Sequence, residues 1–134
     1  MSVGLSVVNV ANRALNHLTG NATWTPPAGL YVQLHKGDPG ASGVLSPSAV
    51  TTRKAATFSA ASSAGIALTG TLPLWARPSM TATETISHLT VWDASTGGNF
   101  LFSLKLNVPK SVVNGDGLAL DSLTMKIAAS ALAS

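Results

Sequence analysis

The chain has 134 residues, of which 46% are hydrophobic and only 10% are charged, and it contains no cysteine. The length fits one domain, and the lack of cysteine excludes disulfides and thiolate metal sites. The net charge of +3 comes from scattered basic residues, so we expect no direct binding of nucleic acid, which requires a basic patch.

The low charge also predicts how the surface is used. An ordinary globular protein has about a quarter of charged residues, whereas here Ser, Thr, Asn, Gly and Ala take their place. An uncharged surface costs little to desolvate when another protein covers it. We therefore expect much of the surface to contact other protein subunits.

Residues 1–20 predict an amphipathic helix. Ser2 or Ser6 can cap its start, and Gly20 is placed to end it. The apolar residues recur at the three- and four-residue spacing of a helix: Val3, Val7, Val10, Ala11, Ala14, Leu15 and Leu18. This helix either covers one face of the domain or forms an N-terminal arm that docks on a neighbouring subunit.

The same segment bears on localisation. Polar residues such as Asn9 and Arg13 interrupt it, and its apolar run is much shorter than the roughly 20 residues of a membrane span. No basic region precedes the apolar part, as it would in a signal peptide. We expect no membrane insertion, and synthesis and assembly in a cytoplasm.

The next segments predict a connector, a strand and a loop. Trp24 begins a connector stiffened by Pro26 and Pro27. Residues 30–35 alternate like a strand. Residues 36–43 are rich in turn formers, with Asp38 expected to hydrogen-bond its own backbone, and they lack the spacing of a phosphate-binding loop.

The remaining chain predicts further short strands. Residues 51–58 and 64–74 are expected strands, followed by a hairpin at residues 85–106 whose turn contains Gly97 and Gly98. Pro109 is expected to end the hairpin. Residues 118–120 and 122–127 complete the strands, and residues 128–134 either form a helix or run over a neighbour. The sequence thus predicts an all-β protein: a β-sandwich or jelly-roll-like single domain at residues 21–134, preceded by the helix or arm at residues 1–20.

Local motifs for catalysis or metal binding are absent from the sequence. The histidines have no partner at metal-ligand spacing, and no nucleophile motif occurs. Four of the five acidic residues lie in or beside predicted turns, where Asp has a structural role. We expect neither an enzyme nor a bound cofactor. Trp75 and Trp92 could form a sugar-binding platform, although a place in the core or an interface is the more common role.

Three segments resemble small structural proteins of tailed bacteriophages, many of which infect actinobacteria. Residues 30–40, LYVQLHKGDPG, are similar to a LYVxLHxGDPG element. Residues 86–102, ISHLTVWDASTGGNFLF, are similar to ITHVxLWDAxTGGxFLF. Pro109 and Lys110, with the later GDGL, resemble PKxVxxGDxLxI. These segments follow the order of the family over about three-quarters of the chain, whereas residues 44–80 match loosely.

The resemblance implies a virion structural protein without catalytic residues. We expect it on the capsid surface, as a decoration or minor capsid protein that forms a homo-oligomer, expected to be a trimer, on the major capsid protein. The alternative is a minor tail or tail-fibre protein, or a module that binds a host-surface glycan through residues 36–43 and 93–99. The expected contact residues are Val3, Val7, Val10, Leu18, Trp24, Asp38, Trp75, Trp92 and Asp93.

Overall fold

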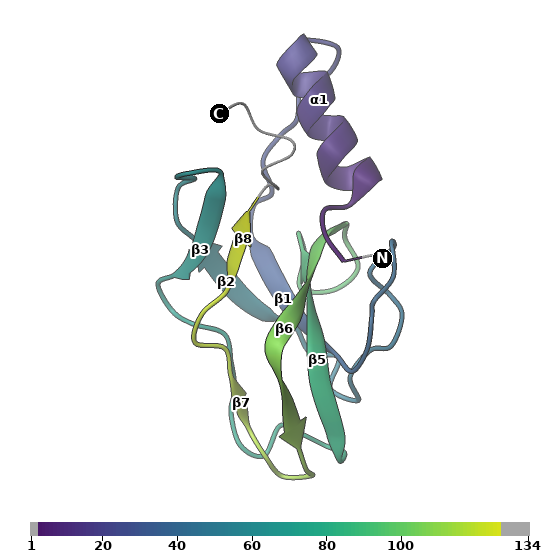
Figure 1. The fold of residues 1–134 in the computed structure, drawn as a ribbon, viewed down its shortest axis with the longest axis vertical. Coiled ribbons are helices and arrows are strands. Elements are labelled where there is room, and N and C mark those ends of the chain that lie inside the picture. The colour runs from purple at the N-terminus through teal and green to yellow at the C-terminus, as the bar shows by residue number, and fades with distance from the viewer. Residues whose placement is uncertain (1–2, 127–134) are drawn as a thin grey trace.

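The computed structural model describes residues 3–126, in which one helical segment precedes an antiparallel β-structure (Figure 1). The strands are β1 (Leu30–His35), β2 (Lys54–Phe58), β3 (Gly65–Thr69), β4 (Leu74–Trp75), β5 (Glu84–Trp92), β6 (Phe100–Val112), β7 (Leu118–Ala119) and β8 (Thr124–Lys126). Six of them form one sheet in the order β6-β5-β1-β2-β3-β8, and β4 pairs with β7. The predicted all-β class with one N-terminal helix is confirmed. The tail at residues 128–134 lies outside the described residues.

The helical segment is shorter than the expected residues 1–20, because it starts at Val7 with Ser6 rather than Ser2 as its cap, while Gly20 ends it as expected. It begins as a π-helical turn, η1 (Val7–Ala11), and continues as α1 (Asn12–Thr19). The Ser6 hydroxyl accepts the backbone N–H of Asn9 at 3.1 Å, which caps the start. Gly20 ends the helix in the left-handed conformation, with φ of 78°. Figure 1 shows this segment projecting from one end of the body along its long axis.

The central hairpin of β5 and β6 is also confirmed. Trp92 pairs with Phe100, and Val91 pairs with Phe102, on either side of the turn at residues 93–99. The expectation that Pro109 ends the hairpin is wrong. His88 pairs with Lys105 and Ile86 pairs with Lys110, so residues 106–109 form a bulge opposite Ser87 that keeps proline out of the ladder.

The hydrophobic core lies on one face of β1 and β5. Val32 pairs with Val91, and Leu34 pairs with Leu89, so four buried side chains share this face. Trp75 of β4 packs into the same core with none of its surface exposed, and its indole N–H donates to the Thr52 carbonyl at 2.9 Å. The core therefore fixes β4 against the sheet, although β4 has only two residues.

Candidate interaction surfaces

The helical segment presents an apolar face that the β-structure of the described residues does not cover. At 100° per residue, Ala11, Ala14, Leu15 and Leu18 lie on one side, and Asn12, Arg13, Asn16 and His17 lie on the other sides. No residue of η1 or α1 is buried, and Leu15 and Leu18 are 60% and 79% exposed. We call residues 3–20 the arm.

The root of the arm is fixed to the body by hydrogen bonds. The Ser6 N–H donates to the Leu101 carbonyl at 2.7 Å, and the Ser103 N–H donates to the Gly4 carbonyl at 2.9 Å. The Asn9 side-chain amide donates to the Phe100 carbonyl at 3.0 Å. Because these bonds are on both sides of the helix start, they hold the direction in which the arm leaves the body.

The predicted contact residues of the arm have different environments. Val7 is 64% exposed and Val3 is half-buried. Val10 packs against the hydrophobic core, so it anchors the arm rather than facing a neighbour. Trp24 is half-buried, and its backbone N–H donates to Nδ1 of His17 at 3.2 Å. Val7 and Leu18 are thus the predicted arm residues most available for contact.

The two loops that the sequence proposed as a contact face do lie together. Ala41, Ser42 and Val44 of one loop line a concavity of about 430 Å³ with Gly98 and Asn99 of the other. The root of the arm contributes Val8 to the same concavity. The structure therefore brings the arm and both loops together at one end of the body.

Asp38 and Asp93 shape these loops. The Asp38 carboxylate accepts the backbone N–H of Gly40 at 2.9 Å. The Asp93 carboxylate accepts both the backbone N–H of Asn99 at 2.6 Å and its side-chain amide at 2.9 Å. Burial alone would raise the pKa of Asp93, but these hydrogen bonds outweigh it and hold that pKa below its ordinary value. The two aspartates have the structural role that turn chemistry predicted.

Arg53 ties the hairpin turn to the sheet. Its Nη1 donates to the carbonyls of Ala94 and Gly97 at 2.8 and 2.7 Å, and its Nε donates to the Gln33 side-chain oxygen at 2.9 Å. The guanidinium carbon lies 4.0 Å from the centre of the Trp92 ring, which is a cation–π contact. One arginine therefore holds the turn and covers a tryptophan.

Behind this contact, a chain of hydrogen bonds fixes the state of a buried histidine. The Trp92 indole N–H, which can only donate, points to the Thr90 hydroxyl at 2.8 Å. The Leu45 carbonyl can only accept, so Nδ1 of His35 carries a proton and donates to it at 2.8 Å. In the neutral ring, Nε2 of His35 then accepts the proton of the Thr90 hydroxyl at 2.9 Å. Burial is the main cause that lowers the pKa of His35. His35 is thus a neutral structural residue.

Comparison with known proteins identifies the family. A family model described as Podophage GP4 fiber I protein gp80 matches residues 6–128, from the serine that caps the arm to beyond β8. The chain belongs to the gp80 family. It is therefore a structural component of a phage virion, as the sequence resemblance implied. A comparison with curated proteins found no match.

In this member of the gp80 family, the tryptophans do not form a sugar platform. Trp75 was expected at a contact surface, but it is fully buried because β4 and β7 hold it in the core. Trp92 was expected there too, but only 7% of it is exposed and Arg53 lies over its ring. Sequence reasoning missed Arg53 because its partners are distant in the sequence.

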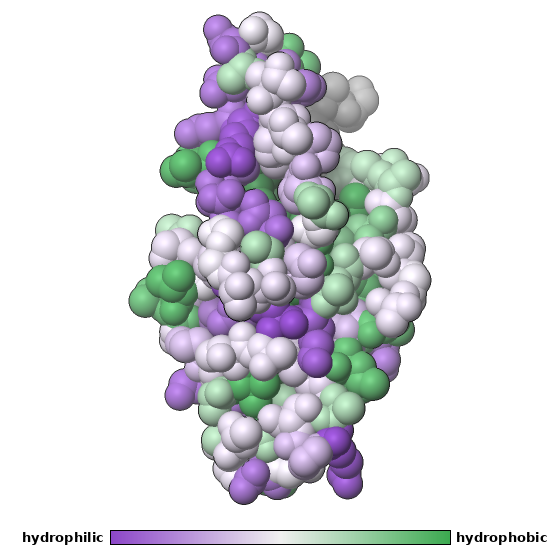
Figure 2. Space-filling view, turned by 180° about the vertical axis from the view of Figure 1, so that it is seen from behind, coloured by the Kyte–Doolittle hydropathy of each residue, from purple (hydrophilic) through white to green (hydrophobic). Residues whose placement is uncertain are grey.

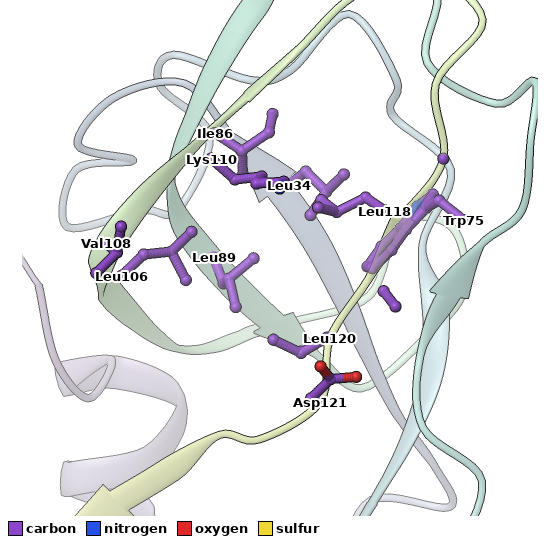
Figure 3. A pocket seen from close by; sticks show the side chains of 12 residues that line it. Leu34, Trp75, Ile86, Leu89, Leu106, Val108, Lys110, Leu118, Leu120 and Asp121 are labelled. Atoms are coloured by element: carbon purple, nitrogen blue, oxygen red, sulfur yellow. The ribbon is translucent and has the colours of Figure 1, made fainter.

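A cavity that the sequence did not predict opens between β6 and the segment containing β7 (Figure 3). Its volume is about 500 Å³. Buried Leu34, Ile86 and Leu89 belong to its lining, together with Leu106 of the β6 bulge and Leu118. Lys110 and Asp121 also line it, so the cavity offers apolar contact together with one positive and one negative group. In the sequence, this cavity is indicated only by the leucines of its two edges, such as Leu106 and Leu118.

The rest of the described surface is of mixed hydropathy. Figure 2 shows a back face that is largely of intermediate hydropathy, with apolar patches among hydrophilic ones. Within residues 3–126, no group of three potential metal ligands gathers. No helix in this range has the length and apolar character to cross a membrane.

Proposed function

We propose that the chain is a fibre-type structural subunit of the phage particle, which joins its neighbours through the arm. The family description supports a fibre at least as well as the capsid decoration expected from the sequence. The observation that carries the role of the arm is its uncovered apolar face, with Leu15 and Leu18 exposed at the end of a segment whose root is held by hydrogen bonds.

The proposed role is one of binding and shape rather than catalysis. Two polar groups of the described structure have structural roles: half-buried Asp93 closes a turn, and buried His35 connects β1 to Thr90 and the Leu45 carbonyl. Most of the exposed large apolar side chains lie on the arm and at Val44 and Leu45 of the neighbouring loop, and the others are Leu72, Leu74, Val108 and Val113. Protein contact is the use that such a surface favours.

The location is tested by imaging particles in which the chain carries a small label at an exposed loop. We expect the label on fibres that project from the particle. A label spread over the capsid lattice would overturn the fibre assignment and favour decoration of the major capsid protein.

The role of the arm is tested in the full-length chain with Leu15→Gln and Leu18→Gln together. We expect the labelled variant to be lost from particles, whereas Arg13→Gln on the polar side is retained. Circular dichroism should show the same β-structure in all three proteins, because none of these side chains is buried. Normal incorporation of the double variant would contradict the role of the arm.

A further inference from the structure

We infer that the cavity between β6 and the segment containing β7 is a binding site for a free amphipathic molecule, whose apolar chain lies on the leucine-rich floor and whose anionic head binds Lys110. The inference goes beyond the proposed function, because neither the arm nor its neighbours in the particle enter it. A negative result would therefore leave the fibre role as it stands.

The cavity reaches the hydrophobic core. The floor consists of side chains that are at most 2% exposed: Leu34, Trp75, Ile86 and Leu89. Leu118 and Leu120 complete the lining from the segment on the other side (Figure 3). The volume of about 500 Å³ is within the range of roughly 300–1,000 Å³ that is typical of small-molecule sites. A cavity with such a floor takes up apolar molecules, because water finds few hydrogen-bond partners there.

The cavity adjoins a groove that runs along β6. β6 is an edge strand of the six-stranded sheet, and a groove of about 150 Å³ lies between its residues 104–107 and residues 122–124. Leu89 and Leu106 line both the cavity and the groove. The two hollows together therefore form an elongated site, which suits an extended chain.

The pairing of β5 with β6 turns Lys110 toward this site. Lys110 pairs with Ile86, and the side chains of directly paired residues lie on the same face of a sheet. Because Ile86 is fully buried, Lys110 begins on the core face of β6 and lines the cavity, beside Ile86 in Figure 3, although it is exposed at the mouth. A lysine in this position keeps its methylene groups on apolar surface and its ammonium group in water. An amphipathic anion matches this arrangement of apolar floor and charged mouth.

Two other charged residues determine the orientation of the ligand. Asp121 lines the cavity at the end away from Lys110 (Figure 3), and Lys105 lines the adjoining groove. Among residues 3–126, neither Lys110 nor Asp121 takes part in an ion pair. Lys110 therefore attracts an anionic head while Asp121 repels it, which selects the end of the cavity at which the head binds. The apolar chain then lies over Leu89 toward Leu106.

Calorimetric titration of the full-length chain with decanoate, at concentrations too low for micelles, tests the site. We expect one decanoate to bind per chain, about tenfold more tightly than uncharged decanol, because the head gains a hydrogen bond between charged groups. Lys110→Gln should remove this tenfold preference, whereas Lys105→Gln on the same strand is the matched control and should keep it. No binding of decanoate, or an equal loss in both variants, would overturn the site. Tighter binding of decylammonium than of decanoate would overturn the role of Lys110, because the head would then bind Asp121.

Trp75 gives a second measurement, because its ring lines the cavity. Decanoate should change the tryptophan emission at the same concentrations at which heat is released, and this change should persist in Trp24→Phe. An unchanged emission would show that decanoate binds elsewhere and would overturn the site.

Flotation with vesicles of phosphatidylglycerol distinguishes a free amphipathic molecule from a membrane lipid, which offers the same chemistry. We expect Lys110→Gln to leave any flotation unchanged, because the net charge of +3 acts on an anionic surface through the whole chain. Flotation that is lost in Lys110→Gln and kept in Lys105→Gln would assign the site to a membrane lipid and overturn the free ligand.

Discussion

Replacement of Gly98 by alanine should destabilise the hairpin far more than replacement of its neighbour Gly97. Both glycines have positive φ, 72° and 61°, so alanine at either position costs about 1–2 kcal/mol of conformational strain. A gain of about 0.4–1 kcal/mol from the stiffer unfolded chain partly offsets this cost. At Gly97 a Cβ atom meets nothing within 4 Å, so Gly97→Ala should cost about 1 kcal/mol or less.

At Gly98 the added atom also disrupts a hydrogen-bonded turn. Its Cβ would lie 2.4 Å from Oδ1 of Asp93 and 2.7 Å from Cβ of Ala94. Asp93 would have to leave the position in which it accepts two hydrogen bonds from Asn99. Since hydrogen bonds to a charged group are worth about 1.5–3 kcal/mol, Gly98→Ala should lower the free energy of unfolding by about 3 kcal/mol in total.

Equilibrium unfolding in urea at one fixed protein concentration measures both losses, because any self-association makes stability depend on concentration. Losses within about 0.5 kcal/mol of each other, the usual error of additivity, would refute the reasoning. The cause can be checked in an Asp93→Ala background, which removes the Asp93 carboxylate and leaves only the contact with Ala94. There Gly98→Ala should cost clearly less than it does in the native chain.

Three further predictions concern the interior. Burial lowers the pKa of His35 in the folded chain, so the unfolded chain binds the proton first as the pH falls. The midpoint temperature of unfolding should therefore decrease below about pH 6.5. A midpoint temperature that stays constant between pH 7.5 and 5 would contradict this. Trp75→Phe leaves the Thr52 carbonyl without its donor and should cost about 1–3 kcal/mol in urea unfolding. Arg53→Lys loses the two hydrogen bonds that Nη1 donates to the carbonyls of the hairpin turn, which should lower the free energy of unfolding by about 1–2 kcal/mol. An unchanged midpoint in urea unfolding would show that these two hydrogen bonds do not stabilise the fold.

The sequence predicted those elements that are determined by residues close together in the chain. Alternation around Trp92 and the two glycines at positions 97 and 98 predicted the β5–β6 hairpin, and Ser6 and Gly20 predicted both ends of the helix. Turn chemistry predicted that Asp93 hydrogen-bonds within its own loop, and the structure confirms this. In each case the residues that decide the structure lie within a few positions of one another.

Features that depend on distant contacts could not be predicted in the same way. Trp75 lies two residues after Pro73 and three before Pro78, a pattern typical of a surface loop, yet pairing of β4 with β7 buries it completely. The direction of the arm was likewise undetermined. An amphipathic pattern shows that a helix has an apolar face, but only the exposure of Leu15 and Leu18 in the structure shows that this face is turned away from the β-structure.

The bulge in β6 has a consequence for the edge of the sheet. β6 is an edge strand of the six-stranded sheet, and such an edge can pair with the edge of another molecule and start strand-by-strand polymerisation. Here residues 106–109 distort the edge, Pro109 has no N–H to offer, and exposed Lys105 and Lys110 flank the distortion. The edge is thereby blocked as a template for pairing with the sheet of another molecule.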